Sequence, residues 1–325
     1  MSIQNFIISV LFILLIATSG CKDSAPGDSD DLASMQRAEI ETFIDDNNLT
    51  ATRHDDGFYF SVVKDSADGR TQSEGKILGI YYSMSILGGQ EISFYLAGNG
   101  APLRLKQGEN AVVPVGLDTG LDLMREGEVY RFILPSNLAF GDLEFSTLIP
   151  LNSIIDVEVE LATIENDNDI SEKEALAIDT YVSSKGLNNL TANPVDSVEI
   201  LSSGLRFKKM VTDSTNTNPG AGLVTITYEG TFLDDVQFDA TTGNDVFKFS
   251  VGAGEVVAGL DEGVGRMKIG ERALLIMPSS LAYGGSARVI PNFLTDDMIE
   301  RQVIPDYVAR VSPYRVLIFD VRLTQ

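Results

Sequence analysis

Two blocks of this sequence repeat each other at a constant distance of 143 residues. GLDTGLDLMREGE (116–128) matches GLDEGVGRMKIGE (259–271) at seven of thirteen positions, and LPSNLAFG (134–141) matches MPSSLAYG (277–284) at five of eight. One spacing shared by separate blocks indicates a tandem duplication. A chain of 325 residues has room for two domains, so we expect two copies of one fold, each of roughly 130–150 residues.

Both copies have the same predicted plan. A short helix comes first, because apolar side chains recur there at helical spacing. These are Ile40, Phe43 and Ile44 in the first copy and Ile178, Tyr181 and Val182 in the second. Ser171 and Glu174 fit a capping box for the second of these helices. Alternating apolar residues then predict strands at 205–207, 224–228, 247–249, 272–277 and 316–323, with one helix at about 260–267.

Many antiparallel strands around one helix indicate the α+β class. We therefore predict two tandem domains, each an antiparallel sheet wrapped on a short helix and each preceded by a short N-terminal helix. The first domain is placed at 35–164 and the second at 172–325, with the polar run ENDNDIS (165–171) as the linker between them.

The residue inventory excludes several kinds of chemistry. The chain has one His, His54 in a polar turn, and one Cys, so a nucleophile–histidine pair or a His/Cys zinc site lacks its components. We expect neither a metal nor a cofactor. The net charge of −23 indicates repulsion from nucleic acid, and its simplest explanation is solubility.

The N-terminus is predicted to be an export signal. Residues 6–17 form an apolar run that is too short to span a bilayer but fits a signal-peptide core, so we assign 1–20 as a signal peptide. ATSGC (17–21) resembles a lipoprotein processing site, with Cys21 as the lipidated residue; the alternative is a plain signal peptide with an incidental Cys. Residues 21–34 are acidic and lack periodicity, which predicts a flexible tether. We expect an exported protein that is lipid-anchored in the cell envelope, on the periplasmic face or the cell surface.

Several segments of the second copy follow the order of one known family. VTITYEG (224–230), FDAT (238–241), the long block 247–285 and LIFDVRL (317–323) resemble an FKBP-type peptidyl-prolyl cis-trans isomerase domain. The resemblance covers about 200–325, and more weakly 55–164. It implies isomerisation of X-Pro bonds in an apolar aromatic pocket, a reaction that needs no His, Cys or metal because no covalent bond breaks.

The resemblance also implies roles for individual residues. Tyr228, Asp239 and Tyr283 take the catalytic positions: the Tyr283 hydroxyl points at the substrate carbonyl, and Asp239 accepts hydrogen bonds and holds Tyr228. The remaining pocket positions fall on Phe238, Phe247, Val256, Val257, Leu260 and Phe319. Leu260 is the floor, where relatives often have Trp, and the Val257 N–H binds a second carbonyl. Without the resemblance, these aromatics would be assigned to the core.

The first copy departs from this pattern. Tyr82 matches Tyr228 and Leu117 matches Leu260, but the other positions are replaced by Ile92, Ser93, Leu103, Phe140 and Val157. Because the carboxylate and one Tyr hydroxyl are lost, we expect a weakly active or inactive first domain with an intact fold.

The second copy contains an insertion. Gly284 and Phe319 are 35 positions apart, against 16 between Gly141 and Val157, and the extra residues lie at about 285–312 with a helical stretch at about 295–303. In the family this loop overhangs the pocket of its own domain. Long loops are often functional lids, so the insertion either widens the contact with unfolded chains or blocks that pocket.

Two functions therefore remain. The first is a peptidyl-prolyl isomerase that assists the folding of exported proteins through the second domain. The alternative is a chaperone-like binding lipoprotein without turnover. The expected partners are proline-containing extended polypeptides, a membrane reached through Cys21 and, by resemblance, macrolide inhibitors.

Overall fold

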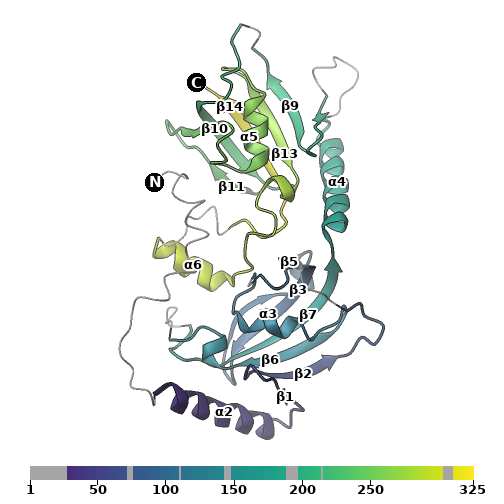
Figure 1. Cartoon of the computed structure of the whole chain (residues 1–325), viewed down its shortest axis with the longest axis vertical. Helices are drawn as coiled ribbons and strands as arrows, with labels where there is room; N and C mark the ends of the chain where they lie inside the picture. Colours follow the sequence, from purple (N-terminus) through teal and green to yellow (C-terminus); the bar gives the residue numbers. More distant parts are fainter. Residues whose placement is uncertain are drawn as a thin grey trace. The chain divides into compact units, whose positions relative to one another are not determined.

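The computed structural model describes residues 28–71, 76–109, 111–142, 148–187, 197–213, 215–302 and 310–325 (Figure 1). The predicted signal peptide, Cys21 and the beginning of the predicted tether lie outside these ranges. Within them, no helix is both long and apolar enough to cross a bilayer.

The chain forms two compact units. The first unit, here the first domain, contains the described parts of 21–167 together with those of 285–313. The second unit, the second domain, contains the described parts of 168–284 and 314–325. The insertion of the second copy thus belongs to the first domain, which corrects its expected place over its own pocket.

In the described residues, each domain has one antiparallel sheet of seven strands. The first sheet contains β1 (Thr52–Arg53), β2 (Tyr59–Lys64), β3 (Ile77–Ile86), β4 (Glu91–Tyr95), β5 (Leu103–Lys106), β6 (Val129–Leu134) and β7 (Ile155–Glu165). The second contains β8 (Glu199–Ile200), β9 (Arg206–Val211), β10 (Leu223–Thr231), β11 (Gln237–Ala240), β12 (Phe247–Ser250), β13 (Arg272–Met277) and β14 (Leu317–Leu323).

The two sheets have the same topology. The first has the strand order β1-β2-β6-β7-β3-β4 with β5 paired to β3, and the second has β8-β9-β13-β14-β10-β11 with β12 paired to β10. Registers also correspond, because Tyr82 pairs with Val159 as Tyr228 pairs with Val321. The structure confirms the predicted α+β class and the duplication.

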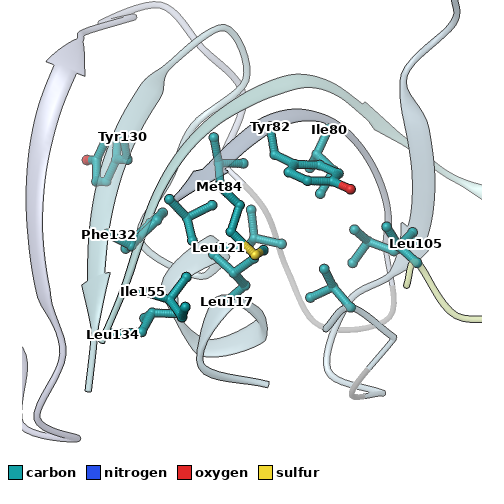
Figure 2. Packing of buried hydrophobic residues seen from close by; sticks show 14 of the residues in the cluster. Ile80, Tyr82, Met84, Leu105, Leu117, Leu121, Tyr130, Phe132, Leu134 and Ile155 are labelled. Carbon is teal, nitrogen blue, oxygen red and sulfur yellow. The ribbon is translucent and has the colours of Figure 1, made fainter. Parts of the chain in front are cut away.

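A short helix packs on each sheet: α3 (Gly116–Leu121) contacts β6, and α5 (Ala258–Gly265) contacts β13 and β14. The repeated glycines explain how close these helices come. A Cβ on Gly120 would lie 2.8 Å from the Phe132 ring, and one on Gly263 would lie 2.5 Å from Leu275. Figure 2 shows Leu117 and Leu121 of α3 beside Met84 and Phe132 in the core of the first domain. The repeated motif is therefore a helix-packing motif in both copies.

The N-terminal helices dock in equivalent ways. These are α2 (Asp28–Asp46), which buries Ile40, and α4 (Asp167–Ser184), which buries Ile178 and Val182. The Ser136 N–H donates to Gln36 Oε1 at 3.0 Å, and the Ser279 N–H donates to Glu174 Oε2 at 2.9 Å. Both serines begin a 3-10 turn, Ser136–Leu138 or Ser279–Leu281.

Three local predictions need correction. The predicted linker 165–171 is structured, because β7 continues to Glu165 and α4 begins at Asp167. Ser171 therefore lies inside α4, and Glu174 binds the Ser279 turn rather than closing a capping box. Likewise α2 begins at Asp28, inside the predicted tether. The helix of the insertion, α6, spans Asn292–Glu300, with Pro291 as its N-cap residue.

Candidate functional site

An aromatic cluster lies on β10, β11, β12 and β14 of the second domain. The Tyr228 ring meets Phe247 edge-on, with centroids 6.0 Å apart, and Phe319 at 5.6 Å. Phe238 meets Phe319 edge-on at 5.5 Å. Sheet register explains this grouping, because β10 pairs with all three other strands and places their side chains beside Tyr228.

Asp239 fixes the orientation of Tyr228. The Tyr228 hydroxyl donates to Asp239 Oδ2 at 2.5 Å, and the Ala240 N–H donates to Oδ1 at 2.9 Å. The backbone N–H of Tyr228 donates to the Thr241 hydroxyl at 2.9 Å. The ring is thus held by a carboxylate on one side and by two phenyl rings on the others, so it forms a rigid wall with a polar edge.

The other predicted site residues lie on the second domain's helix and loops. Leu260 is buried on α5. Val257 caps that helix, and its carbonyl accepts the Leu260 N–H at 3.0 Å. Val256 precedes it and is half-buried. Tyr283 follows the Ser279–Leu281 turn and is 37 % exposed. Gly284 closes that turn with a φ of +53°, donating its N–H to the Ser279 carbonyl at 2.9 Å.

Two contributors to this cluster were not predicted. Gly230 makes room for Phe238, because a Cβ there would lie 2.7 Å from the Phe238 ring. Phe232 stacks obliquely on Phe238 at 5.0 Å, and the Arg315 guanidinium lies 4.4 Å above the Phe232 ring. The glycine two residues after Tyr228 in VTITYEG was the available signal, since glycine within a strand often marks a close approach.

The first domain repeats this arrangement with different chemistry. The Tyr82 hydroxyl and Ser93 Oγ are 2.9 Å apart, where the second domain has tyrosine and aspartate. Burial raises the pKa of Tyr82, and the Ser93 hydrogen bond opposes that shift. Leu103 and Val157 replace the two phenyl rings, by register with Ile80 and Met84. The counterpart of Gly230 is Met84, so the space for a phenyl ring beside it is filled.

Metal-ligating side chains and the single histidine were also located in the described residues. They contain no cluster of three or more His, Cys, Asp or Glu side chains suited to a metal ion. The ring of His54 stacks on Phe58 at 4.4 Å, and its Nδ1 accepts the Asp56 N–H at 3.2 Å. That histidine therefore supports a turn.

Comparison with known proteins agrees with this geometry. The family model for FKBP-type peptidyl-prolyl cis-trans isomerases matches residues 69–162 and 214–324. The chain belongs to this family. It is a two-domain FKBP-type protein, and both matches fall on the duplicated sheets.

Individual relatives match parts of the chain. Peptidyl-prolyl cis-trans isomerase Fkbp12 of Drosophila melanogaster is 46 % identical over 71 residues, which cover 21 % of this chain and 66 % of that protein. The bovine FKBP10 isomerase is 28 % identical over 180 residues, which cover 54 % of this chain and 25 % of that protein. The match thus spans less than two thirds of either relative.

Solved structures are also similar. The crystal structure of the three FKBP domains of wheat FKBP73 matches with a TM-score of 0.30 and 18 % identity, covering 83 % of this chain and 95 % of that one. A peptidyl-prolyl isomerase from Pseudomonas syringae matches with a TM-score of 0.32 and 21 % identity, covering 48 % of this chain and 94 % of that one.

Proposed function

We propose that the second FKBP domain catalyses cis–trans isomerisation of X-Pro peptide bonds. The observation that carries this proposal is the Tyr228–Asp239 pair set among Phe238, Phe247 and Phe319. Membership of the isomerase family supports it. Catalysis resides in the second domain, because the first lacks the carboxylate and the phenyl walls.

The chemistry required is modest. Rotation about the bond breaks amide resonance, which gives a barrier of about 18–20 kcal/mol without breaking any covalent bond. The twisted amide has less charge on its oxygen than the planar one, so an apolar surface favours the twisted form relative to the ground state. Phe247 and Phe319 supply that surface for the proline ring, with Leu260 beneath it.

Polar groups orient the substrate. Tyr283 is accessible and can donate its hydroxyl to the substrate carbonyl. In the described part of the chain, no acceptor faces the Val257 N–H, which leaves it to bind a second carbonyl. Asp239 is already engaged with Tyr228, so its main task is to hold the wall in place.

The test is the cis-to-trans rate of a short X-Pro peptide measured with the full chain. Asp239→Ala should lower kcat/KM by about 10-fold or more, since a hydrogen bond to a charged group contributes about 1.5–3 kcal/mol. Tyr283→Phe should also lower it. Ser93→Ala, the matched change in the first domain, should leave it unchanged. Absence of acceleration by the folded wild-type chain would favour a non-catalytic, chaperone-like binding protein.

We further propose that this activity serves exported proteins and that Cys21 carries a lipid anchor. The support is the apolar run at 6–17 followed by a single Cys. Metabolic labelling with a clickable fatty acid should label the wild type and not Cys21→Ser, which should leave the membrane fraction. Equal labelling of both chains would reject the anchor.

Macrolide inhibitors of the family should compete with substrate at the second domain.

A further inference from the structure

The insertion contributes to the core of the first domain. Val289 and Leu294 are buried members of its core cluster, at 5 % and 7 % exposure. Ile290, Phe293 and Met298 pack against the same cluster. That cluster includes the residues at the first domain's pocket positions, which are Tyr82, Ile92, Leu103, Leu117, Phe140 and Val157. The segment therefore covers the surface that corresponds to the candidate site of the second domain.

The backbone of this segment binds as an added strand. The Val289 N–H donates to the Ala111 carbonyl at 2.8 Å, and the Val113 N–H donates to the Val289 carbonyl at 3.0 Å. Val112 and Val289 form a parallel bridge. Main-chain pairing of this kind is one way in which proteins hold extended peptides, with side chains giving specificity. By the 143-residue repeat, Val113 corresponds to Val256 and the next residue, Pro114, to Val257, so the donor expected at Val257 does not exist in the first domain.

The side chains complete the contact. Phe293 meets Phe140 edge-on with centroids 5.7 Å apart, and α6 lies against β4. Phe140 is 6 % exposed, whereas Tyr283 at the matching position of the second domain is 37 % exposed. Pro291, which follows Ile290, is buried as well. An extended apolar segment with an Ile-Pro step, followed by one helix, therefore occupies the first domain.

We propose that residues 287–298 are a built-in ligand of the first domain, and that this domain's former substrate site is a docking site for the insertion. The loss of the carboxylate at Ser93 and of the N–H at Pro114 suits this occupant, which presents aliphatic side chains and one phenyl ring. The site takes an apolar X-Pro segment of the same kind from outside only when the insertion leaves. Because the segment is tethered, its effective concentration is on the order of millimolar, which a free peptide must exceed.

Hydrogen–deuterium exchange on the full chain tests this without any measurement of turnover, so its outcome is separate from that of the proposed isomerase activity. Phe293→Ala combined with Leu294→Ala should raise exchange at 111–113 and 287–294 at least 10-fold more than at β6 and β7, whose exchange rises only with the lower stability of the domain. Asp296→Ala, an exposed position on the same helix, is the matched control and should change nothing.

The decisive arm adds a free peptide with the sequence of residues 286–298. In the double variant it should restore protection at 111–113 but not at 287–294, with an apparent Kd at least 10-fold lower than for the wild type. If the double variant unfolds the domain, Val289→Pro replaces it in this experiment. That change removes the hydrogen bond from the Val289 N–H to the Ala111 carbonyl and alters no residue of 28–167, and the same result is expected. The proposal is overturned if the wild type and the variants that release the insertion bind the peptide equally. It is also overturned if neither Phe293→Ala/Leu294→Ala nor Val289→Pro changes exchange at 111–113.

Discussion

The two domains share a strand order and a register but differ in the residues at the pocket positions. The second domain holds its tyrosine with Asp239 and lines it with phenyl rings, whereas the first pairs Tyr82 with Ser93 and has Leu103 and Val157 as walls. The first is also covered by α6. The comparison teaches that a duplicated site changes its use through a few wall residues while the scaffold beneath is retained.

The retained scaffold has a physical reason. Gly120 and Gly263 allow each helix to approach its sheet, and Leu117 and Leu260 are buried at the same helical position. Apolar residues replace apolar residues at the walls, and a core tolerates such changes when volume is roughly kept. The side chains that hold the fold together are therefore largely different from those that line the site.

The largest expected effect comes from giving the second domain the walls of the first. Phe247→Leu with Phe319→Val removes two rings that face Tyr228, so kcat/KM for an X-Pro peptide should fall about 10- to 100-fold, in line with about 2 kcal/mol of lost apolar contact. Circular dichroism checks the fold. Phe94→Leu, on an exposed residue of β4, is the control, and an equal loss there would show that the effect is not specific to the site.

A second change acts on the first domain alone. Leu294→Ala creates a cavity where α6 meets the first domain, so the free energy of unfolding of that domain should fall by about 2–3 kcal/mol. Urea titration followed by NMR signals of β6 and β7 measures it, while turnover stays unchanged. Leu176→Ala, at a position 71 % exposed on α4, should leave both quantities as they are. A loss of turnover in Leu294→Ala would contradict the assignment of catalysis to the second domain alone.

The docked N-terminal helices offer a smaller contrast. Gln36→Ala leaves the Ser136 N–H and hydroxyl without their acceptor, which should lower the stability of the first domain by about 1–2 kcal/mol. Glu174→Gln keeps an amide oxygen for the Ser279 N–H, so the second domain should lose less than about 1 kcal/mol. The same NMR-detected titration compares them. A larger loss of stability in Glu174→Gln than in Gln36→Ala would mean that the charge of Glu174, and not only its hydrogen bond, holds α4 in place.

The smallest expected effect concerns the first domain, where restoring two polar side chains should produce no isomerase activity. Ser93→Asp with Phe140→Tyr restores two polar groups to the first domain, but Phe293 and Leu294 still cover them. In an Asp239→Ala background, isomerase activity should stay at the background level. Activity that returns without release of the insertion would show that the first site is open to substrate.

Four of the expected site residues come together in the folded chain, and their roles stay predictions. Tyr228, Asp239, Phe247 and Phe319 were expected because their order along the chain carries the family pattern, and the sheet brings them side by side. Gly230 and Phe232 were missed because their effect depends on close approach in space. The helix boundaries near 165–171 were wrong because a polar run fits an exposed helix start as well as a linker.

The destination of the insertion had no local signal. Val289 pairs with Val112, far away in the sequence, and a loop that continues from Gly284 is expected over its own domain. The backbone pairing of Val289 and the apolar contacts of α6 with the first domain determine the outcome, and these are properties of the folded chain. The helix itself was predicted within a few residues, since its spacing is a local property.

The most direct test of the division of roles is an amide NMR titration of the full chain with a short X-Pro peptide. Exchange broadening and shifts should be confined to the second domain, centred on Asp239, Ala240 and Val257, while Val112 and Val113 stay unperturbed. Perturbation of Val112 and Val113 at the same peptide concentration, or perturbation of neither group, would contradict the assignment of catalysis to the second domain and of self-docking to the first.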